Sequence, residues 1–338
     1  MKMTLQSIAD ALGLSKVTVS VVLNGRAAQY GIRPATAAKI KAYCAQKKYA
    51  INVNARRINS KLARNVGMVV FEGYDEDPNP MEDYYDAMVV GGAAMAAKKN
   101  GFCTSLIINH QENELDGILT RFYAKEVDGF ILSGFPVAPS WRENFRREKI
   151  PVVVVGDDPA QGLPTVNINN YEMSYALTQH VIGRAGRRQV GFLSGSPFAY
   201  VGNERRRGFE HAMTAHGLTP VFDVNCMFFE ERAYEQVKRL LARRKFACDA
   251  IVCANDYMAL GALRALHEKG IEVPREIAVT GGDDIPTLKY VSPALSTYSL
   301  LPGEQGRQAF LLFQNIAGGQ DCPQTAGVKS ELKLRQSA

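Results

Sequence analysis

Pairs of polar or aromatic residues occur where a ligand could be bound, directly after short apolar runs or at the start of a helical stretch. These pairs are Asn169 and Asn170, Asn255 and Asp256, Asp283 and Asp284, and Tyr84 and Tyr85. Carboxylates and amides that form paired hydrogen bonds, together with aromatic faces for stacking, suit a polyhydroxyl ring or a nucleobase. A single Asn or Asp is equally often a helix N-cap, and for Asp256 taken alone we favour a cap.

The motifs of several enzyme classes are absent from the sequence. The chain contains no G-x-x-x-x-G-K-[ST] loop, no G-x-S-x-G elbow and no G-x-G-x-x-G, so nucleotide-dependent and acyl-transfer chemistry have no motif to carry them. The six cysteines show no C-x-x-C spacing and the five histidines form no ligand motif, so we predict neither a metal nor a cofactor. An enzyme of sugar metabolism could use Asp256 or Asp283, but nothing pairs either residue with a nucleophile.

The candidate ligand residues lie in a region where short apolar runs alternate with helical patterns. The apolar runs are 66–71, 104–108, 129–132, 152–155, 190–193, 250–253 and 277–280. Buried strands separated by helices are typical of parallel sheets covered on both faces. Residues 66–338 are enough for two such lobes, and ligands of such sheets bind beyond the carboxyl ends of the strands. The sequence therefore predicts an α/β domain with a ligand site between two lobes.

The N-terminal segment differs sharply in charge from the rest of the chain. Residues 1–65 contain twelve Lys and Arg residues and one acid, Asp10, a formal charge of +11, whereas residues 66–338 carry −5. A compact basic segment suits a polyanion, because each neutralised phosphate releases counterions. A solvated basic surface without a partner is the alternative that charge alone leaves open. No apolar run approaches a membrane span and no signal-like stretch follows the start, so we expect a cytoplasmic protein associated with the nucleoid.

Periodicity within the basic segment predicts two short helices joined by a turn. The apolar stripe of the first helix consists of Leu5, Ile8, Ala9 and Leu12. Gly13 ends that helix, Ser15 caps a second one, and a third follows over 34–48. Two helices joined by about three residues with a glycine form a helix-turn-helix, whose short side chains, hydroxyls and ammonium group reach base edges and phosphates. The DNA contacts predicted on the second helix and its caps are Ser15, Lys16, Val17, Thr18, Ser20, Val21 and Asn24.

The order of residues in this head resembles a known family. Segments 5–15, 18–20 and 23–25 read LQSIADALGLS, TVS and LNG, and they are similar to the DNA-binding head of the LacI/GalR family of bacterial transcription regulators. The resemblance runs through the whole chain. Segments 255–263 (NDYMALGAL) and 281–286 (GGDDIP) resemble specific segments of that family's effector domain.

The resemblance implies an order of domains. It implies a helix-turn-helix domain at 1–48, a hinge helix or linker at 49–65, and an effector-binding and dimerisation domain at 66–338. The lobes of that domain are expected at 66–165 with 300–323, and at 166–299 with 324–335. The resulting fold is an all-α head followed by a two-lobed domain like a periplasmic binding protein, with parallel sheets.

The resemblance also implies site residues. In the hinge, Ala55, Arg56 and Ile58 are implied to contact DNA, with Ile58 as a wedge in the minor groove; a flexible basic linker is the alternative. Arg205, Asn255 and Asp283 occupy positions that usually hydrogen-bond the effector. The full set of predicted effector contacts is Tyr84, Tyr85, Asn170, Arg205, Asn255 and Asp283.

Three departures from the family pattern change what the resemblance implies. Val21 stands where the family usually has an Arg that contacts guanine, so we expect an unusual operator that is read more through Lys16. Gly282 replaces a usual aromatic residue, and Leu300 falls where Gln is common. These two replacements put the shape of the ligand site near Asp283 in question.

We therefore predict a homodimeric transcription regulator, a repressor, that binds a pseudo-palindromic double-stranded operator. The resemblance implies a carbohydrate effector, with a purine as the alternative, and leaves open a tetramer and whether the ligand weakens or strengthens operator binding. Two other classes remain as alternatives. A small-molecule binding protein without a role on DNA explains only the second domain, and an α/β enzyme lacks a catalytic pair.

Overall fold

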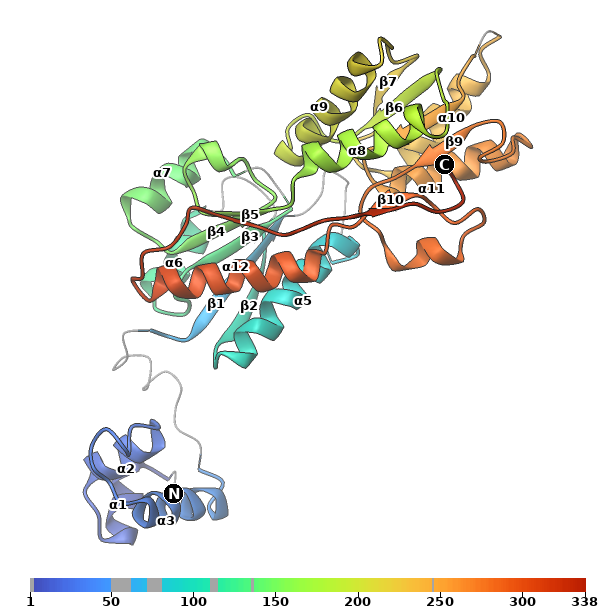
Figure 1. Cartoon of the computed structure of the whole chain (residues 1–338). Coiled ribbons are helices and arrows are strands. Elements are labelled where there is room, and N and C mark those ends of the chain that lie inside the picture. The colour runs from blue at the N-terminus through green and yellow to red at the C-terminus, as the bar shows by residue number, and fades with distance from the viewer. Residues whose placement is uncertain (1–2, 50–61, 72–80, 110–114, 135–136, 245) are drawn as a thin grey trace. The chain divides into compact units, whose positions relative to one another are not determined.

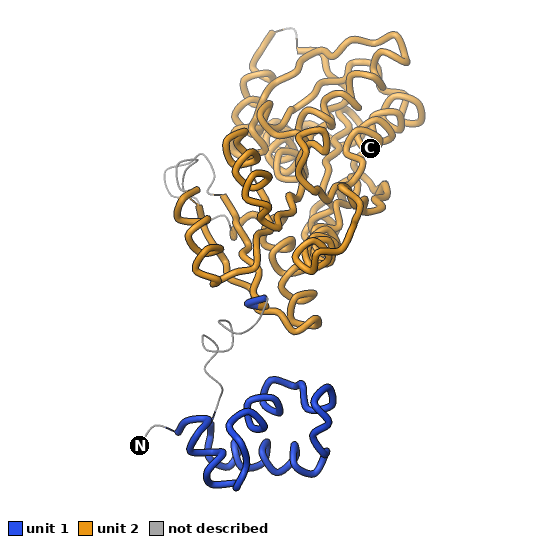
Figure 2. Tube along the Cα trace, turned by 90° about the vertical axis from the view of Figure 1, so that its left-hand side faces the viewer, with its two compact units in different colours: residues 1–63 blue, residues 64–338 orange. Residues whose placement is uncertain are grey.

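The computed structural model describes residues 3–49, 62–71, 81–109, 115–134, 137–244 and 246–338. The chain divides into two compact units, residues 1–63 and 64–338, which Figure 2 colours separately. Among the described residues no single helix is long and apolar enough to cross a membrane. Only the sharply bent pair of the first two helices meets the length and composition test, when the two are taken together.

The first unit is a three-helix head formed by α1 (Leu5–Leu12), α2 (Lys16–Leu23) and α3 (Pro34–Gln46). Gly13 adopts φ 67° after α1, so that the Leu14 N–H donates to the Ala9 carbonyl at 2.9 Å and closes the helix end. The chain bends by 111° between α1 and α2, within the range of a helix-turn-helix. The three helices share one small core of Ile8, Ala9, Val19, Val22, Ile40 and Cys44.

The second unit contains two parallel sheets and the two lobes that the sequence predicts (Figure 1). The first lobe has the strand order β11-β5-β4-β3-β1-β2. Its strands are β1 (Asn65–Phe71), β2 (Cys103–Asn109), β3 (Phe130–Ser133), β4 (Val152–Val155), β5 (Thr165–Asn167) and β11 (Thr325–Gly327). Helices α5 (Tyr84–Lys99) and α12 (Pro302–Ala317) pack against each other and against the sheet. The core formed with α6 (Leu115–Tyr123) and α7 (Pro139–Arg147) contains Trp141 and Phe145.

The second lobe has the strand order β7-β6-β8-β9. Its strands are β6 (Val190–Ser194), β7 (Asp223–Asn225), β8 (Ala250–Cys253) and β9 (Ala278–Thr280), and its helices are α8 (Asn170–Gly183), α9 (Tyr200–Ala215), α10 (Glu230–Leu241) and α11 (Asp256–Glu268). Helices α8 and α9 pair with each other, as do α10 and α11. Beside this sheet, β10 (Thr297–Tyr298) and β12 (Leu332–Lys333) form a short antiparallel ladder. Two short 3₁₀ helices, Pro159–Gln161 and Pro286–Tyr290, lie in the connections.

The chain crosses between the lobes slightly later than we expected from the sequence. We placed the ends of the first lobe at residues 165 and 323, but β5 continues to Asn167, and β11 pairs with it in parallel register. The Val328 N–H donates to the Asn167 carbonyl at 2.8 Å, which extends this pairing. The free edge of β5 thus binds the returning C-terminal segment, because unpaired backbone groups at a sheet edge are readily completed by another strand.

The α5–α12 contact gives a test of the first lobe. A Cβ on Gly306 would lie 2.0 Å from the Val89 carbonyl oxygen of α5. To relieve this contact the two packed helices would have to move apart, which costs free energy. We expect Gly306→Ala to lower the unfolding free energy by roughly 2 kcal/mol or more, as in overpacked cores. The matched control is Gly303→Ala in the same helix, where a Cβ meets nothing closer than 3.6 Å. That variant should be neutral or more stable by up to about 1 kcal/mol in denaturant unfolding followed by circular dichroism. Equal loss in both variants would contradict this packing.

Candidate functional site

The N-terminus of α2 carries the exposed residues of the predicted DNA-reading surface. The Ser15 hydroxyl accepts the Thr18 N–H at 3.0 Å and caps the helix. Lys16 is exposed, and the Val17 side chain is 68 % exposed although it is apolar. The helix carries no acidic side chain, and helix N-termini favour phosphate. This end of α2 therefore offers an ammonium group and a bare methyl surface side by side.

Val21 does not belong to this surface. We predicted it as a DNA contact, but its side chain is 6 % exposed. At the end of α2, Gly25 at φ 75° reverses the chain direction, and the Arg26 N–H donates to the Val21 carbonyl at 3.0 Å. Asn24 also stabilises this end of α2, because its side-chain amide donates to the Ser20 carbonyl at 2.8 Å.

The three hinge residues predicted to contact DNA lie outside the described residues. These are Ala55, Arg56 and Ile58. Their roles remain predictions from the family resemblance.

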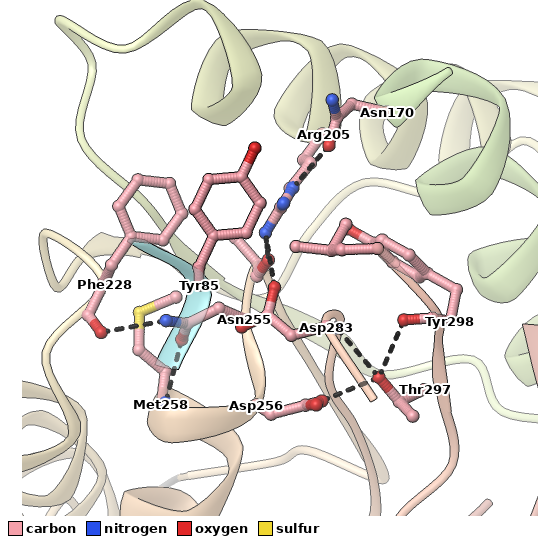
Figure 3. Close-up of polar contacts among 12 residues, drawn as sticks. Tyr85, Asn170, Arg205, Phe228, Asn255, Asp256, Met258, Asp283, Thr297 and Tyr298 are labelled. Carbon is pink, nitrogen blue, oxygen red and sulfur yellow. Dashed lines mark hydrogen bonds and ion pairs between the residues drawn. The ribbon is translucent and has the colours of Figure 1, made fainter. Parts of the chain in front are cut away.

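The second unit brings several of the predicted ligand residues together around a buried guanidinium. Arg205, in α9, is 5 % exposed. Its Nε donates to Asn170 Oδ1 at 2.9 Å and its Nη1 to the Ala254 carbonyl at 2.6 Å. The same Nη1 lies 3.4 Å from Asp283 Oδ1 in an ion pair (Figure 3). Arg205, Asn170 and Asp283 thus meet at the carboxyl ends of the strands of the second sheet, where a ligand is expected.

Asn255 has the capping role that the sequence left open for any single Asn or Asp, and Asp256 has a different structural role. The Asn255 side chain caps α11 by accepting the Met258 N–H at 2.9 Å, and it donates to the Phe228 carbonyl at 3.0 Å (Figure 3). Our preference for Asp256 as the cap was wrong. Its buried carboxylate accepts the Thr297 hydroxyl at 2.7 Å and the Ile285 N–H at 3.0 Å. These bonds hold the segment that carries Asp283 against α11.

Tyr298 is a residue of the site that the sequence did not reveal. Its ring lies beside the Arg205 guanidinium, with 5.7 Å from Cζ to the ring centroid (Figure 3). A Cβ on Gly282 would lie 2.4 Å from this ring. The aromatic residue that the family usually has at position 282 therefore cannot fit, because Tyr298 fills the space instead. In the sequence, the glycine at position 282 indicated that the usual aromatic ring is absent, but it did not show that Tyr298 occupies the space of that ring.

The first lobe contributes the start of α5. Asp83 caps this helix by accepting the Asp86 N–H at 3.1 Å, and the Tyr85 hydroxyl donates to Gln305 at 3.0 Å. Figure 3 shows Tyr85 beside Arg205, although the two side chains come from different lobes. Tyr84 packs against the core of the second lobe. Both predicted tyrosines therefore lie where the lobes meet.

Asp86 is a buried carboxylate in this region. It accepts the Ser133 hydroxyl at 2.6 Å. Burial, and next the charge of Asp83, raise the pKa of Asp86 to about 7, against the smaller lowering effect of Ser133. Burial also raises the pKa of Asp83, and the charge of Glu230 adds to that rise. Sequence reasoning missed Asp86 because one acid in a first helical turn is ordinary.

Comparison with known proteins agrees with this arrangement. A sequence profile for the periplasmic binding protein-like domain matches residues 178–338. The chain is 28% identical over 319 residues to the HTH-type transcriptional repressor PurR of Haemophilus influenzae, covering 93% of this chain and 91% of that protein. It is 29% identical over 346 residues to PurR of Yersinia enterocolitica, covering 99% and 96%.

Solved structures match along the entire chain. The lac repressor dimer bound to operator and the anti-inducer ONPF has a TM-score of 0.87 at 19% identity and covers 100% of this chain and 99% of that one. The complex of the transcriptional regulator CelR with cellobiose has a TM-score of 0.73 at 25% identity and covers 100% of both chains. A helix-turn-helix head joined to a two-lobed binding domain defines a class of ligand-controlled transcription regulator. Along its whole length the chain is similar to transcriptional repressors and regulators of the LacI/GalR family, the resemblance that its sequence predicted.

The buried carboxyl of Asp86 predicts a pH dependence of stability. Its pKa in the folded chain, about 7, lies above its ordinary value of 3.8, so the folded state binds more protons between these values. The unfolding free energy of the second unit should therefore fall as the pH rises from about 4 to about 7. Asp86→Asn should flatten this dependence, whereas Asp116→Asn, at an exposed position on α6, should retain it. Thermal unfolding across this pH range measures the effect, and identical profiles for Asp86→Asn and the unchanged protein would refute it.

Proposed function

We propose that this protein is a sequence-specific repressor whose affinity for its operator is controlled by a small molecule bound between the lobes of the second unit. The observation that carries the DNA role is the exposed N-terminus of α2, with Lys16 and Val17, in an N-terminal segment (residues 1–65) of formal charge +11. In this proposal Lys16 contacts phosphate or guanine and Val17 contacts a thymine methyl group. Ser15 and Thr18 support phosphate contacts. Such a protein acts in the cytoplasm, at the nucleoid.

Two copies of the chain would read the two halves of a near-palindromic operator. An unpartnered face in the first lobe supports a dimer. The edge strand β2 exposes Leu106 and Ile108, and α5 beside it exposes Met88 and Met95. Exposed apolar side chains along a sheet edge favour association. The solved lac repressor that resembles this chain is a dimer on operator DNA.

The ligand site is proposed around Arg205, Asn170 and Asp283, with Tyr84 and Tyr85 from the opposite lobe. The guanidinium, amide and carboxylate suit a ligand with several hydroxyl groups, and CelR was solved with the disaccharide cellobiose. Because the site takes groups from both lobes, the ligand would bind more tightly when the lobes close. That difference in affinity is what shifts a two-state equilibrium and alters operator binding.

Salt-dependent operator binding tests the DNA role. Genomic fragments selected by the full-length protein should outcompete random DNA, and the affinity should fall steeply with salt. Lys16→Gln should reduce the slope of log affinity against log salt by about two, because a dimer loses one phosphate contact in each half-site. Lys269→Gln, at an exposed position of the second lobe, is the matched control and should leave the slope unchanged. A selected fragment that binds no better than random DNA would rule out this function.

A neutral substitution at Val17 tests base reading separately. Val17→Gln removes the apolar surface without changing the charge, so we expect a changed consensus at one position of each half-site with an unchanged salt slope. Repeated selection from a randomised library measures the consensus. If the same sequence is selected by both proteins, Val17 does not read a base.

A further inference from the structure

A chain of hydrogen bonds joins residues of the two lobes at the proposed ligand site, through a segment that crosses between the lobes. In the first lobe, the Tyr85 hydroxyl donates to Gln305 Oε1 at 3.0 Å. The Gln305 side-chain amide donates in turn to the Leu300 carbonyl at 2.7 Å. The Leu300 N–H donates at 3.2 Å to the carbonyl of Asp283, in the second lobe. Tyr85 and Asp283 are therefore connected through only two intermediate residues.

Gln305 is the buried middle of this chain of bonds. It lies near the start of α12 and is 2 % exposed. A buried amide is stable only when its donor and its acceptor are paired, and here Oε1 accepts from Tyr85 while Nε2 donates to Leu300. If either partner moves, Gln305 must follow it or leave a buried polar atom unpaired, which is destabilising. The positions of Tyr85 and Leu300 therefore depend on each other.

The crossing segment next to Gln305 has an uncommon backbone conformation. Leu301 adopts φ 50° and ψ 53° immediately before Pro302. Residues other than glycine populate this left-handed region sparsely, and a following proline restricts the backbone further. Such a conformation persists only where the surrounding contacts fix it. The bond from Gln305 to the Leu300 carbonyl is one of these contacts, so its loss allows the crossing to relax.

The Tyr85 end of the chain of bonds lies where the lobes meet. Figure 3 shows the Tyr85 ring beside Arg205 of the second lobe. A Cβ on Gly156, directly after β4 in the first lobe, would lie 3.6 Å from both the Tyr85 hydroxyl oxygen and Val201 Cγ1 of α9. The hydroxyl end of Tyr85 and the start of α9 therefore both border Gly156. A ligand bound at Arg205 would contact or displace the Tyr85 ring.

We propose that Gln305 is a positioning residue that couples the ligand site to the arrangement of the lobes. It holds the Tyr85 ring in place for the ligand and at the same time fixes the crossing at Leu300 and Leu301. A ligand that shifts the Tyr85 ring acts through Gln305 on this crossing, and so favours one arrangement of the lobes over another. The inference rests on the proposed function, because it assigns the residue through which the ligand controls operator affinity.

Hydrogen exchange followed by mass spectrometry tests the chain of bonds in the full-length protein without ligand. Gln305→Met keeps an unbranched side chain of similar volume but removes both bonds of the amide. We expect the backbone amides of the crossing, residues 296–301, to exchange faster by about threefold or more. Residues 281–286 of the second lobe should also exchange faster, because the bond between Asp283 and Leu300 loosens with the crossing.

Gln308→Met on the same helix is the matched control. The Gln308 side chain donates to Glu304 of its own helix at 3.0 Å, so its replacement should leave the exchange of 296–301 and 281–286 unchanged. If Gln305→Met accelerates exchange only within α12, the residue stabilises its own helix and the proposed coupling is wrong.

Operator affinity tests whether Tyr85 and Gln305 act as a unit. Tyr85→Phe removes only the hydroxyl, and with it only the first bond of the chain. We expect Tyr85→Phe and Gln305→Met to change the affinity for a genomic fragment selected by the unchanged protein in the same direction, each by about threefold or more. The double variant should change it no more than Gln305→Met alone, because the two residues share one interaction. Gln308→Met should bind the fragment as the unchanged protein does.

Additive effects of Tyr85→Phe and Gln305→Met, or unchanged operator affinity in both, would overturn the inference. If Gln305→Met does not fold, Tyr85→Phe alone must still accelerate exchange of 296–301 and change operator affinity. The unchanged protein separates these results from failure of the proposed function. If it binds the selected fragment, any of these outcomes removes only the role of Gln305. If it selects no fragment, the proposed function is ruled out and the inference falls with it.

Discussion

The proposed ligand site of the second lobe depends on one buried positive charge. The guanidinium of Arg205 is buried, and an isolated buried charge is destabilising by several kcal/mol unless it is paired and hydrogen-bonded. Its partners come from three places: Asn170 at the start of α8, Ala254 after β8 and Asp283 after β9. Arg205 therefore fixes α9 relative to the carboxyl ends of the sheet, and the second lobe presents a rigid half of the ligand site.

The other half of the proposed site comes from the first lobe. Tyr85 belongs to α5, and Figure 3 shows it beside Arg205. The chain crosses between the lobes at residues 168–169, 299–301 and 328–331, which lie outside the helices and strands. In the proposed function, a ligand that contacts groups of both lobes binds one arrangement of the lobes more tightly than another, and this difference in affinity is what switching requires.

Much of this could be predicted from the sequence, because it rests on local patterns. The apolar runs coincide with the main strands of both sheets, and Gly13 and Ser15 mark the end of α1 and the start of α2. The predicted ligand residues Asn170 and Asp283 both contact Arg205. Short edge strands such as β7 and β11 were not predicted, because three residues are too few to show a periodic pattern of apolar side chains. The burial of Val21 was missed because the helical pattern of α2 does not show how the chain continues after the reversal at Gly25.

The exchange between Gly282 and Tyr298 shows why the ligand cannot be inferred from the family alone. In the family pattern an aromatic ring extends from the residue before the aspartate, whereas here the ring reaches the same space from β10. The Tyr298 ring carries a hydroxyl and lies 5.7 Å from Arg205 Cζ. Arg205 and Asp283, which this chain shares with the family pattern, therefore do not identify the ligand by themselves. The shape of the proposed site is set by Gly282 and Tyr298, where this chain departs from that pattern.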